Sequence, residues 1–475
     1  MSENTNSVLK RSVDWKQGLA IALGVPLLIL PSIGYFVTYA WSISILIWFL
    51  SVIQGFMQNI AYGEMATMLP EASGLPGYAQ KVFQNKKKSL SIGNFIGGFS
   101  AWSYWFAWAP VMAIFSLLIG SYLKELIPIL RDYSDMTIAA ISALLIFTVL
   151  FFINSKGLKN GATLGYFLAL LALLPLAIIV LAAFVTGTFN LDNISSHVFP
   201  DDFEMSGKNV LVIIGLFAMA QWSACAWETA AVYGPEYKNP KSDIIKALFT
   251  CGFVCLFTFV IIQAVCIGVV GIDGIVKNPN LPMLIVSEGI FGPVGSVIAI
   301  IALISSMVLI IQTAFLGSSR AIHSMAIESN LPIVFGKTNK NGVPVYAMLI
   351  IALLNMFLIG LKTPSAIVAA SSIGYIFANG ISLLAYFKLK SDPKYKNMGE
   401  FKVPGFYKYV AAFWGIINIP IFLCGIVYLN SIDLGWKSSL TGFVVLSLYV
   451  PLWISTKKRE SLMKKEIIVN ETTSE

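Results

Sequence analysis

The sequence has few charged residues for its length. Only 12% of its 475 residues are Asp, Glu, Lys or Arg, whereas an average soluble chain carries roughly 25%. Hydrophobic residues make up 57% of the chain, and the mean hydropathy is +0.78. So few charges cannot cover the surface of a soluble globule of this size. The composition therefore predicts an integral membrane protein.

Histidine and cysteine are also scarce, and their positions exclude several kinds of site. The two histidines, His197 and His323, fall on opposite sides of the membrane in the topology described below, which excludes catalysis by a histidine pair. The cysteines all lie within predicted spans, where disulfides and zinc sites are not expected: Cys225, Cys251, Cys255, Cys266 and Cys424. Paired carboxylates and Ser/His arrangements are missing too. We therefore expect no catalytic residues, no metal and no cofactor.

Long apolar runs are what the sequence has in abundance. Runs of about 20 residues are long enough to cross the hydrocarbon core of a bilayer. They predict twelve transmembrane helices, at residues 18–38, 42–62, 95–123, 136–153, 162–187, 208–233, 245–271, 293–317, 344–361, 365–387, 406–429 and 438–455. Most of the loops between these runs are short. We therefore predict one transmembrane domain at residues 15–456, between polar tails at residues 1–14 and 457–475.

The distribution of positive charge predicts the orientation of this domain. No cleavable signal is visible before the first span, so we expect the amino terminus to stay in the cytoplasm. All but six of the 32 Lys and Arg then fall in inner loops, the exceptions being Lys124, Arg131, Lys208, Lys277, Lys362 and Lys437. This bias follows the positive-inside rule and places both termini in the cytoplasm. Because the charges are scattered, the net charge of +8 does not indicate nucleic-acid binding.

Two spans carry an interruption near their middle. Proline removes a backbone donor and breaks a helix. The first span contains Gly24-Val25-Pro26 and then Pro31, and the sixth contains Ser223-Ala224-Cys225-Ala226. Many transporters have two repeats of five helices, the second inverted, so that the first and sixth spans correspond. The alternatives are a simple proline kink, or small residues that let helices pack closely.

Five short stretches of the chain, taken in order, carry a resemblance to a known family. They are Gly63-Glu64-Met65 with Pro70-Glu71-Ala72-Ser73-Gly74; Trp227-Glu228 with Glu236-Tyr237-Lys238-Asn239-Pro240; Ser319-Arg320; Asn330-Leu331-Pro332 with Gly342-Val343-Pro344; and Phe401-Lys402-Val403-Pro404-Gly405. These stretches are similar to motifs of the amino acid-polyamine-organocation (APC) family of transporters. The resemblance implies an all-α membrane protein of twelve transmembrane helices, with two inverted five-helix repeats (LeuT-like) plus two extra helices.

The chain departs from the family pattern in two places. The usual first-span pattern "GSG(I/V)F" reads Gly24-Val25-Pro26-Leu27-Leu28, and Ala226 stands where a glycine is usual. The backbone geometry of both breaks is therefore open. The fifth span also contains no lysine, although some members use one there in place of a sodium ion. That coupling device is not expected here.

A broken helix can bind an amino acid without charged side chains. Exposed amides at the start of a half-helix attract the carboxylate, and free carbonyls at the end of one accept from the ammonium group. The predicted substrate-binding residues at the two breaks are Gly24, Val25, Pro26, Trp222, Ser223 and Ala224. The last three resemble a stretch of the family's arginine/agmatine antiporters, and the resemblance adds Trp108 and Gln312. Trp222 is expected to close over the substrate; the alternative is an interfacial anchor.

Glu228 is the predicted proton-coupling residue. An ionisable side chain near the centre of a bilayer costs roughly 2.5–3.5 kcal/mol. Burial disfavours the charged form of a carboxyl group, so Glu228 could load and release a proton during transport. The alternative is a neutral, hydrogen-bonded acid that only braces the sixth span. Glu64, at the inner end of the second span, is expected to be structural.

The resemblance implies secondary active transport of an amino acid or related amine by alternating access, through proton symport or exchange. The expected partners are this substrate, a proton or exchanged solute, and the lipid bilayer. Sodium-coupled transport of a small organic solute is an alternative, with Ser305 and Ser306 as candidate ligands, although membrane serines more often bond their own helix. A channel is disfavoured because no filter-like repeat appears.

Overall fold

The computed structural model describes residues 8–85, 87–201, 203–360, 364–395 and 398–459. In this part of the chain, eleven helices or helix pairs are long and apolar enough to cross a membrane: Trp15–Ala40, Ile43–Met68, Ile92–Leu126, Asp135–Ser155, Leu158–Val185, Gly207–Glu236, Pro240–Lys277, Pro293–Ile327, Ile367–Ser391, Tyr407–Asp433 and Trp436–Arg459. The remaining predicted span is α14 (Val345–Ile359), which has 15 residues. A helix therefore stands at each of the twelve predicted positions.

Three spans are interrupted by a turn or a 3-10 helix inside the bundle. The first span consists of α1 (Trp15–Ala22), the 3-10 helix η1 (Val25–Ile29) and α2 (Ile33–Ala40), and the sixth of α10 (Gly207–Ala224) and the 3-10 helix η3 (Ala226–Glu236). Both predicted interruptions are confirmed. The third was not predicted from the sequence: Pro110 separates α5 (Ile92–Trp108) from α6 (Val111–Leu126).

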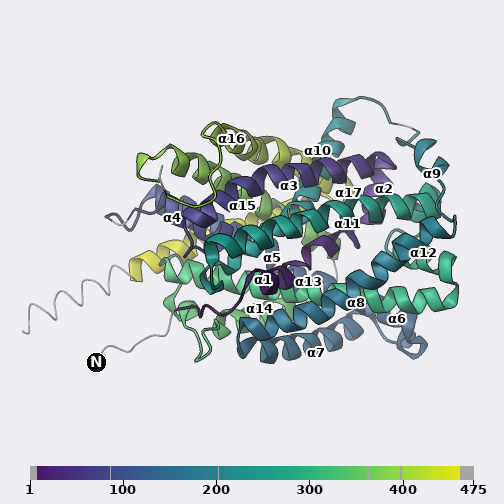
Figure 1. The fold of residues 1–475 in the computed structure, drawn as a ribbon, viewed down its shortest axis with the longest axis horizontal. Coiled ribbons are helices and arrows are strands. Elements are labelled where there is room, and N and C mark those ends of the chain that lie inside the picture. Colours follow the sequence, from purple (N-terminus) through teal and green to yellow (C-terminus); the bar gives the residue numbers. More distant parts are fainter. Residues whose placement is uncertain (1–7, 86, 202, 361–363, 396–397, 460–475) are drawn as a thin grey trace, which may run out of the picture.

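The other long helices surround these broken spans, and most of them run roughly along the long axis of the bundle (Figure 1). They are α3 (Ile43–Met68), α7 (Asp135–Ser155), α8 (Leu158–Val185), α11 (Pro240–Lys277), α13 (Pro293–Ile327), α15 (Pro364–Ser391), α16 (Tyr407–Ile417) with η6 (Asn418–Phe422) and α17 (Leu423–Asp433), and α18 (Trp436–Ser447). Three shorter helices lie outside the predicted spans: α4 (Gly74–Phe83), α9 (Asp192–Ser195) and α12 (Pro282–Phe291). We call the two ends of the bundle the α4 end and the α9 end.

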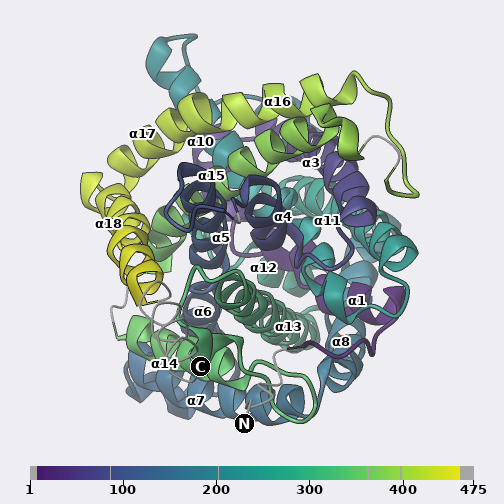
Figure 2. The same cartoon turned by 90° about the vertical axis from the view of Figure 1, so that its left-hand side faces the viewer.

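The spans form an inner group and an outer group. In the view along the bundle axis, α5 and α13 lie near the centre, whereas α7, α14, α16 and α18 lie at the periphery (Figure 2). Of the most apolar stretch in each span, 83% is buried in the first and third spans but only 28% in the fourth and the twelfth. The peripheral helices expose apolar side chains, as lipid-facing helices do. The inner group holds the broken spans.

Part of the predicted amino-terminal tail is packed against the bundle. Val13 is fully buried and forms an isolated β-bridge with Tyr237, and Arg11 forms an ion pair with Glu71. Asp14 caps α1: its carboxylate accepts from the Gln17 amide, and the Gln17 side chain accepts from the Asp14 amide, both at 3.0 Å. Residues 1–7 and 460–475 of the predicted tails lie outside the described residues.

Candidate functional site

The break in the first span packs directly against α13. The Thr313 hydroxyl donates to the Ile21 carbonyl, in the last turn of α1, at 2.5 Å and to the Leu309 carbonyl at 2.9 Å. A Cβ atom at Gly24 would overlap the Thr313 side chain, so only glycine fits this approach. Val25 and Pro26 follow it in η1 and are fully buried. Thr313 was not anticipated; a hydroxyl in an otherwise apolar stretch was its only signal.

Side chains satisfy the backbone carbonyls at the break in the sixth span. The Trp227 indole donates to the Ala224 carbonyl at 3.0 Å, and the Asn59 amide donates to the Cys225 carbonyl at 3.3 Å. The Ser223 hydroxyl donates to Ala220 within its own helix at 3.2 Å. In this conformation, the carbonyls of Ala224 and Cys225 therefore already have side-chain partners.

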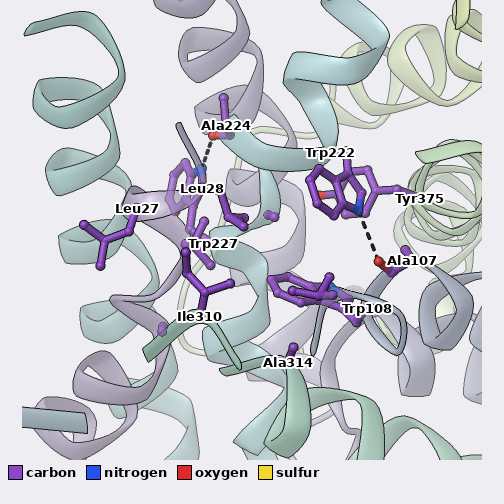
Figure 3. Close-up of a cluster of buried hydrophobic side chains, with 14 of the residues drawn as sticks. Leu27, Leu28, Ala107, Trp108, Trp222, Ala224, Trp227, Ile310, Ala314 and Tyr375 are labelled. Carbon is purple, nitrogen blue, oxygen red and sulfur yellow. Dashed lines mark hydrogen bonds between the residues drawn. The ribbon is translucent and has the colours of Figure 1, made fainter. Parts of the chain in front are cut away.

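The predicted tryptophans belong to one cluster of buried side chains beside the two breaks (Figure 3). The Trp222 indole donates to the Ala107 carbonyl at 3.2 Å, which ties α10 to the last turn of α5. Figure 3 shows Trp222 close to Tyr375 and above Trp108. Trp108 is 2% exposed, and its indole nitrogen is buried without a hydrogen-bond partner among the described residues. Leu28 of η1 reaches the same cluster (Figure 3).

A cavity of about 780 Å³ lies on the α9 side of these tryptophans. Its walls come from α2, α6, α7, α10, α15 and α17 and from the segment before α12. Polar side chains of the wall include Ser32, Tyr35, Tyr39, Asp135, Asn280, Asn430 and Asp433. Trp222 also lines the cavity and is only 5% exposed. Its ring therefore forms part of the wall between the cavity and the breaks.

Glu228 lies at the start of η3 and is fully buried. The Tyr375 hydroxyl donates to its Oε2 atom at 3.2 Å, and Oε1 has no hydrogen-bond partner among the described residues. Tyr375 comes from α15, which the sequence analysis did not connect with this site. One hydrogen bond leaves part of this buried carboxyl group without a partner, which costs free energy in a protein interior.

Glu236, at the other end of η3, forms a buried ion pair. The Arg320 guanidinium donates to its two carboxylate oxygens at 2.8 and 2.9 Å, and both side chains are at most 2% exposed. The Ser12 amide donates to the Glu236 carbonyl at 2.8 Å, and the Lys238 amide donates to the Val13 carbonyl at 2.8 Å. These contacts join the amino-terminal segment, η3 and α13 at the α4 end.

Tyr237, just after η3, adds a further contact at the α4 end. Burial raises the pKa of its phenol well above the ordinary value, so the hydroxyl stays neutral and donates to the Ala230 carbonyl at 3.0 Å. A Cβ atom at Gly18 of α1 would overlap this ring. At the α4 end, then, α1 and η3 are in close contact, whereas the cavity separates helices at the α9 end.

Gln312 lies away from the tryptophans and belongs to a different contact. Its amide exchanges two hydrogen bonds with Asn154 of α7, at 2.8 and 2.9 Å, and donates to the Gly161 carbonyl of α8 at 3.3 Å. All of these bonds are buried. The structure thus places Gln312 where it joins α13 to α7 and α8, and does not bring it together with the other candidates.

Glu64 and the two candidate sodium ligands are also engaged. Tyr386 and Lys390 of α15 donate to the Glu64 carboxylate, and the Val403 amide donates to it at 3.1 Å. This arrangement agrees with the expected structural role. The Ser306 hydroxyl donates to the Ala302 carbonyl of its own helix at 2.7 Å, and Ser305 is 8% exposed.

Comparisons with known proteins were made for the whole chain. A family model described as Amino acid permease matches residues 14–449. The chain is 26% identical to a putative arginine/ornithine antiporter of Bacillus subtilis (strain 168) over 326 residues, 64% of this chain and 66% of that protein. It is 25% identical to an arginine/ornithine antiporter of Latilactobacillus sakei over 65% of this chain and 63% of that protein.

A third relative is the lysine-specific permease LysP of Lactococcus lactis subsp. cremoris (strain MG1363), 23% identical over 68% of this chain and 64% of that protein. The chain thus matches just under two thirds of the length of these three relatives. Among solved structures, the Eremococcus coleocola manganese transporter, in complex with an aromatic bis-isothiourea substituted compound, has a TM-score of 0.57 at 13% identity. That match covers 96% of this chain and 99% of the other, and it shows a shared fold.

Proposed function

Because this chain belongs to the amino acid permease family, within the APC superfamily that its motifs indicated, we propose that it is a secondary active transporter. It carries an amino acid or related amine across the membrane by alternating access. The fold supports this proposal, because the predicted class of twelve transmembrane helices with inverted five-helix repeats is the one that the comparisons show. In such proteins the substrate binds between broken helices near the middle of the membrane.

One observation carries the proposal: a cavity reaches the region of the two breaks from the α9 end, whereas side chains and backbone join the helices at the α4 end. The cavity reaches Trp222 from the α9 end, while the Glu236–Arg320 ion pair and the amino-terminal segment join the helices at the α4 end. Access limited to one side is what alternating access requires of each resting state. The substrate then binds near Gly24, Val25 and Pro26, beneath Trp222.

The direction of access follows from the positive-inside rule. The loops at the α4 end carry most of the lysines and arginines, so this end faces the cytoplasm. Both termini are then cytoplasmic, and the α9 end with its cavity faces outward. The described conformation is therefore an outward-facing one, ready to receive substrate from outside.

The substrate we favour is a basic amino acid. Two of the relatives above are named as arginine/ornithine antiporters and one as a lysine-specific permease. Aromatic rings at Trp108 and Trp222 lie beside the breaks, and such rings attract cationic groups. Coupling is to a proton through Glu228 or to an exchanged amino acid. Ser306 bonds its own helix, which gives no support to sodium coupling.

Transport of labelled L-arginine into proteoliposomes tests this function. We expect saturable uptake that is accelerated by unlabelled arginine inside the vesicles, because a carrier, unlike a channel, exchanges its substrate. Trp222→Ala should abolish saturable uptake, since it removes the ring between cavity and breaks and its bond to Ala107. The control is Trp436→Ala, which removes an indole that is 65% exposed at the α9 end.

Two results would contradict the proposal. Uptake that does not saturate and shows no counterflow would indicate a channel. Normal affinity and rate in Trp222→Ala, in a protein that reaches the membrane as the wild type does, would remove Trp222 from the transport path. Loss of uptake in both tryptophan variants would show that the effect is not specific to this position.

A further inference from the structure

The cavity at the α9 end contains a carboxylate, Asp433, that pairs with no basic residue in the described part of the chain. Asp433 ends α17 and lines the cavity. The second carboxylate of the lining, Asp135, forms an ion pair with Lys124 at 2.5 Å, whereas no ion pair within the described part of the chain includes Asp433. The cavity wall is therefore negative on the side of α17.

Two tyrosines of α2 stand beside this carboxylate. The Tyr39 hydroxyl donates to Asp433 Oδ1 at 2.9 Å, and the rings of Tyr35 and Tyr39 are 5.0 Å apart. Both rings line the cavity. A carboxylate beside aromatic faces suits an ammonium or guanidinium group, which is attracted by the charge and by the rings together.

Two other residues of the cavity wall each have a polar group that is hydrogen-bonded within the protein. The Asn430 amide donates to the Ala369 carbonyl and to Ser439, each at 3.2 Å, and the Asn280 carbonyl accepts from Tyr122 at 2.7 Å. Asp433 is exposed and keeps acceptor positions beyond its bond with Tyr39. A cavity of about 780 Å³ is within the range of small-molecule sites, roughly 300–1,000 Å³.

We propose that Asp433, Tyr35 and Tyr39 form an outer binding site for the cationic side chain of the substrate, occupied before Trp222 admits the substrate to the breaks. This inference rests on the proposed function and names the part of the cavity that selects a basic amino acid. Because Asp433 is exposed, its attraction is screened by salt. The outer site therefore raises the capture of dilute substrate and leaves the maximal rate unchanged.

Uptake of L-arginine by proteoliposomes, measured at about 10 mM and about 150 mM salt, tests the outer site. Asp433→Asn should raise the KM about three- to tenfold at low salt, as expected for loss of an exposed charge and a cation–aromatic contact. The maximal rate should stay constant, and the salt dependence of the KM should disappear. Asp433→Glu should restore both. Tyr35→Leu, which keeps the charge, should raise the KM less and preserve the salt dependence.

The matched control is Asp192→Asn, which removes an exposed carboxylate at the same end but outside the cavity lining. It should behave as wild type. L-citrulline, which carries a neutral urea group in place of the guanidinium, serves as a competitor of arginine uptake. Its inhibition constant should be the same in Asp433→Asn and in the wild type.

Three outcomes overturn the outer site. They are an unchanged arginine KM in Asp433→Asn, an increase of the same size at both salt concentrations, and an equal weakening of citrulline. The last two would show that Asp433 only supports the structure. If the wild type itself transports no arginine, the proposed substrate class fails as well. If the wild type transports arginine and Asp433→Asn transports it with the same KM, only the proposal of the outer site fails.

Discussion

One glutamate is buried at each end of η3, and the two carboxyl groups have different hydrogen-bond partners. Glu236 receives two hydrogen bonds from Arg320, at 2.8 and 2.9 Å. Glu228, eight positions earlier, receives one from Tyr375 at 3.2 Å, and its second oxygen has no partner among the described residues. The same side chain in the same helix thus has a two-fold contact with a positive charge at one end, and a single hydrogen bond from a neutral hydroxyl at the other.

The difference follows from what each end of η3 must do. Glu236 lies at the closed α4 end, where an arginine supplies a charge that is never lost. A buried ion pair needs good geometry to offset desolvation, and the two-fold contact with Arg320 provides it. Glu228 lies beside the break, within reach of the substrate region. If Glu228 couples protons to transport, a permanent counter-charge there would stop a proton from being bound and released.

Breaking the pair at the closed end should have the largest effect. Glu236→Gln leaves the guanidinium of Arg320 buried without a counter-charge, because Tyr233 and Ser319 offer only a ring face at 6.0 Å and a hydroxyl at 3.4 Å. We expect the free energy of unfolding to fall by about 3–5 kcal/mol. Thermal and denaturant unfolding of the purified protein measures this loss.

The control for that variant is Glu400→Gln. Glu400 pairs with Lys241 at 3.2 Å, but their side chains are 66% and 48% exposed. Losing this exposed pair should change stability by at most about 1 kcal/mol. If both variants lose the same stability, or neither does, the contrast between a buried and an exposed pair is wrong.

Replacing both partners sharpens the same comparison. Glu236→Met combined with Arg320→Met removes the pair without leaving a buried charge, and methionine fills comparable space. Such replacements are often neutral or stabilising, so most of the loss seen in Glu236→Gln should be recovered. A double variant as unstable as Glu236→Gln would mean that the amino-terminal contacts at Ser12 and Val13, and not the charge, depend on Glu236.

The sequence was sufficient to predict the spans and both breaks. Apolar length gave the twelve helix positions, and Pro26 with its neighbouring small residues indicated the interruption in the first span. These features are local, because they depend on residues close together in the chain. The break at Pro110 was missed, although proline there is a local signal as well, because the run from 95 to 123 was treated as one continuous helix.

Contacts between helices that lie far apart in the chain could not be predicted from the sequence. Tyr375 lies 147 positions from Glu228, and nothing in either segment indicates that they meet. Gln312 was expected to face the substrate, but Asn154, 158 positions away, takes its amide. In both cases the partner is determined by how α13 and α15 pack against other helices. The roles of Gly24, Trp108, Trp222 and Glu228 in transport remain predictions.

Glu228, at the other end of η3, should matter for the pH dependence of uptake more than for stability. Glu228→Gln keeps the shape and can still accept from Tyr375, so we expect a loss of at most about 1 kcal/mol in the free energy of unfolding. If a protonated Glu228 is required to carry substrate inward, wild-type uptake falls as pH rises, because fewer carriers hold the proton. The glutamine variant stays neutral at every pH, and its uptake should be flat.

A measurement of substrate exchange distinguishes a loss of proton coupling from a loss of transport as a whole. Substrate-for-substrate exchange does not require an empty, deprotonated carrier to return, so Glu228→Gln should retain exchange while net uptake driven by a pH gradient is lost. Glu288→Gln, which removes an exposed carboxyl on α12, should leave both processes unchanged. An unaltered pH profile in Glu228→Gln would refute proton coupling. Glu228 would then be a neutral brace between η3 and α15, held by Tyr375, and the two ends of η3 would differ in charge without differing in function.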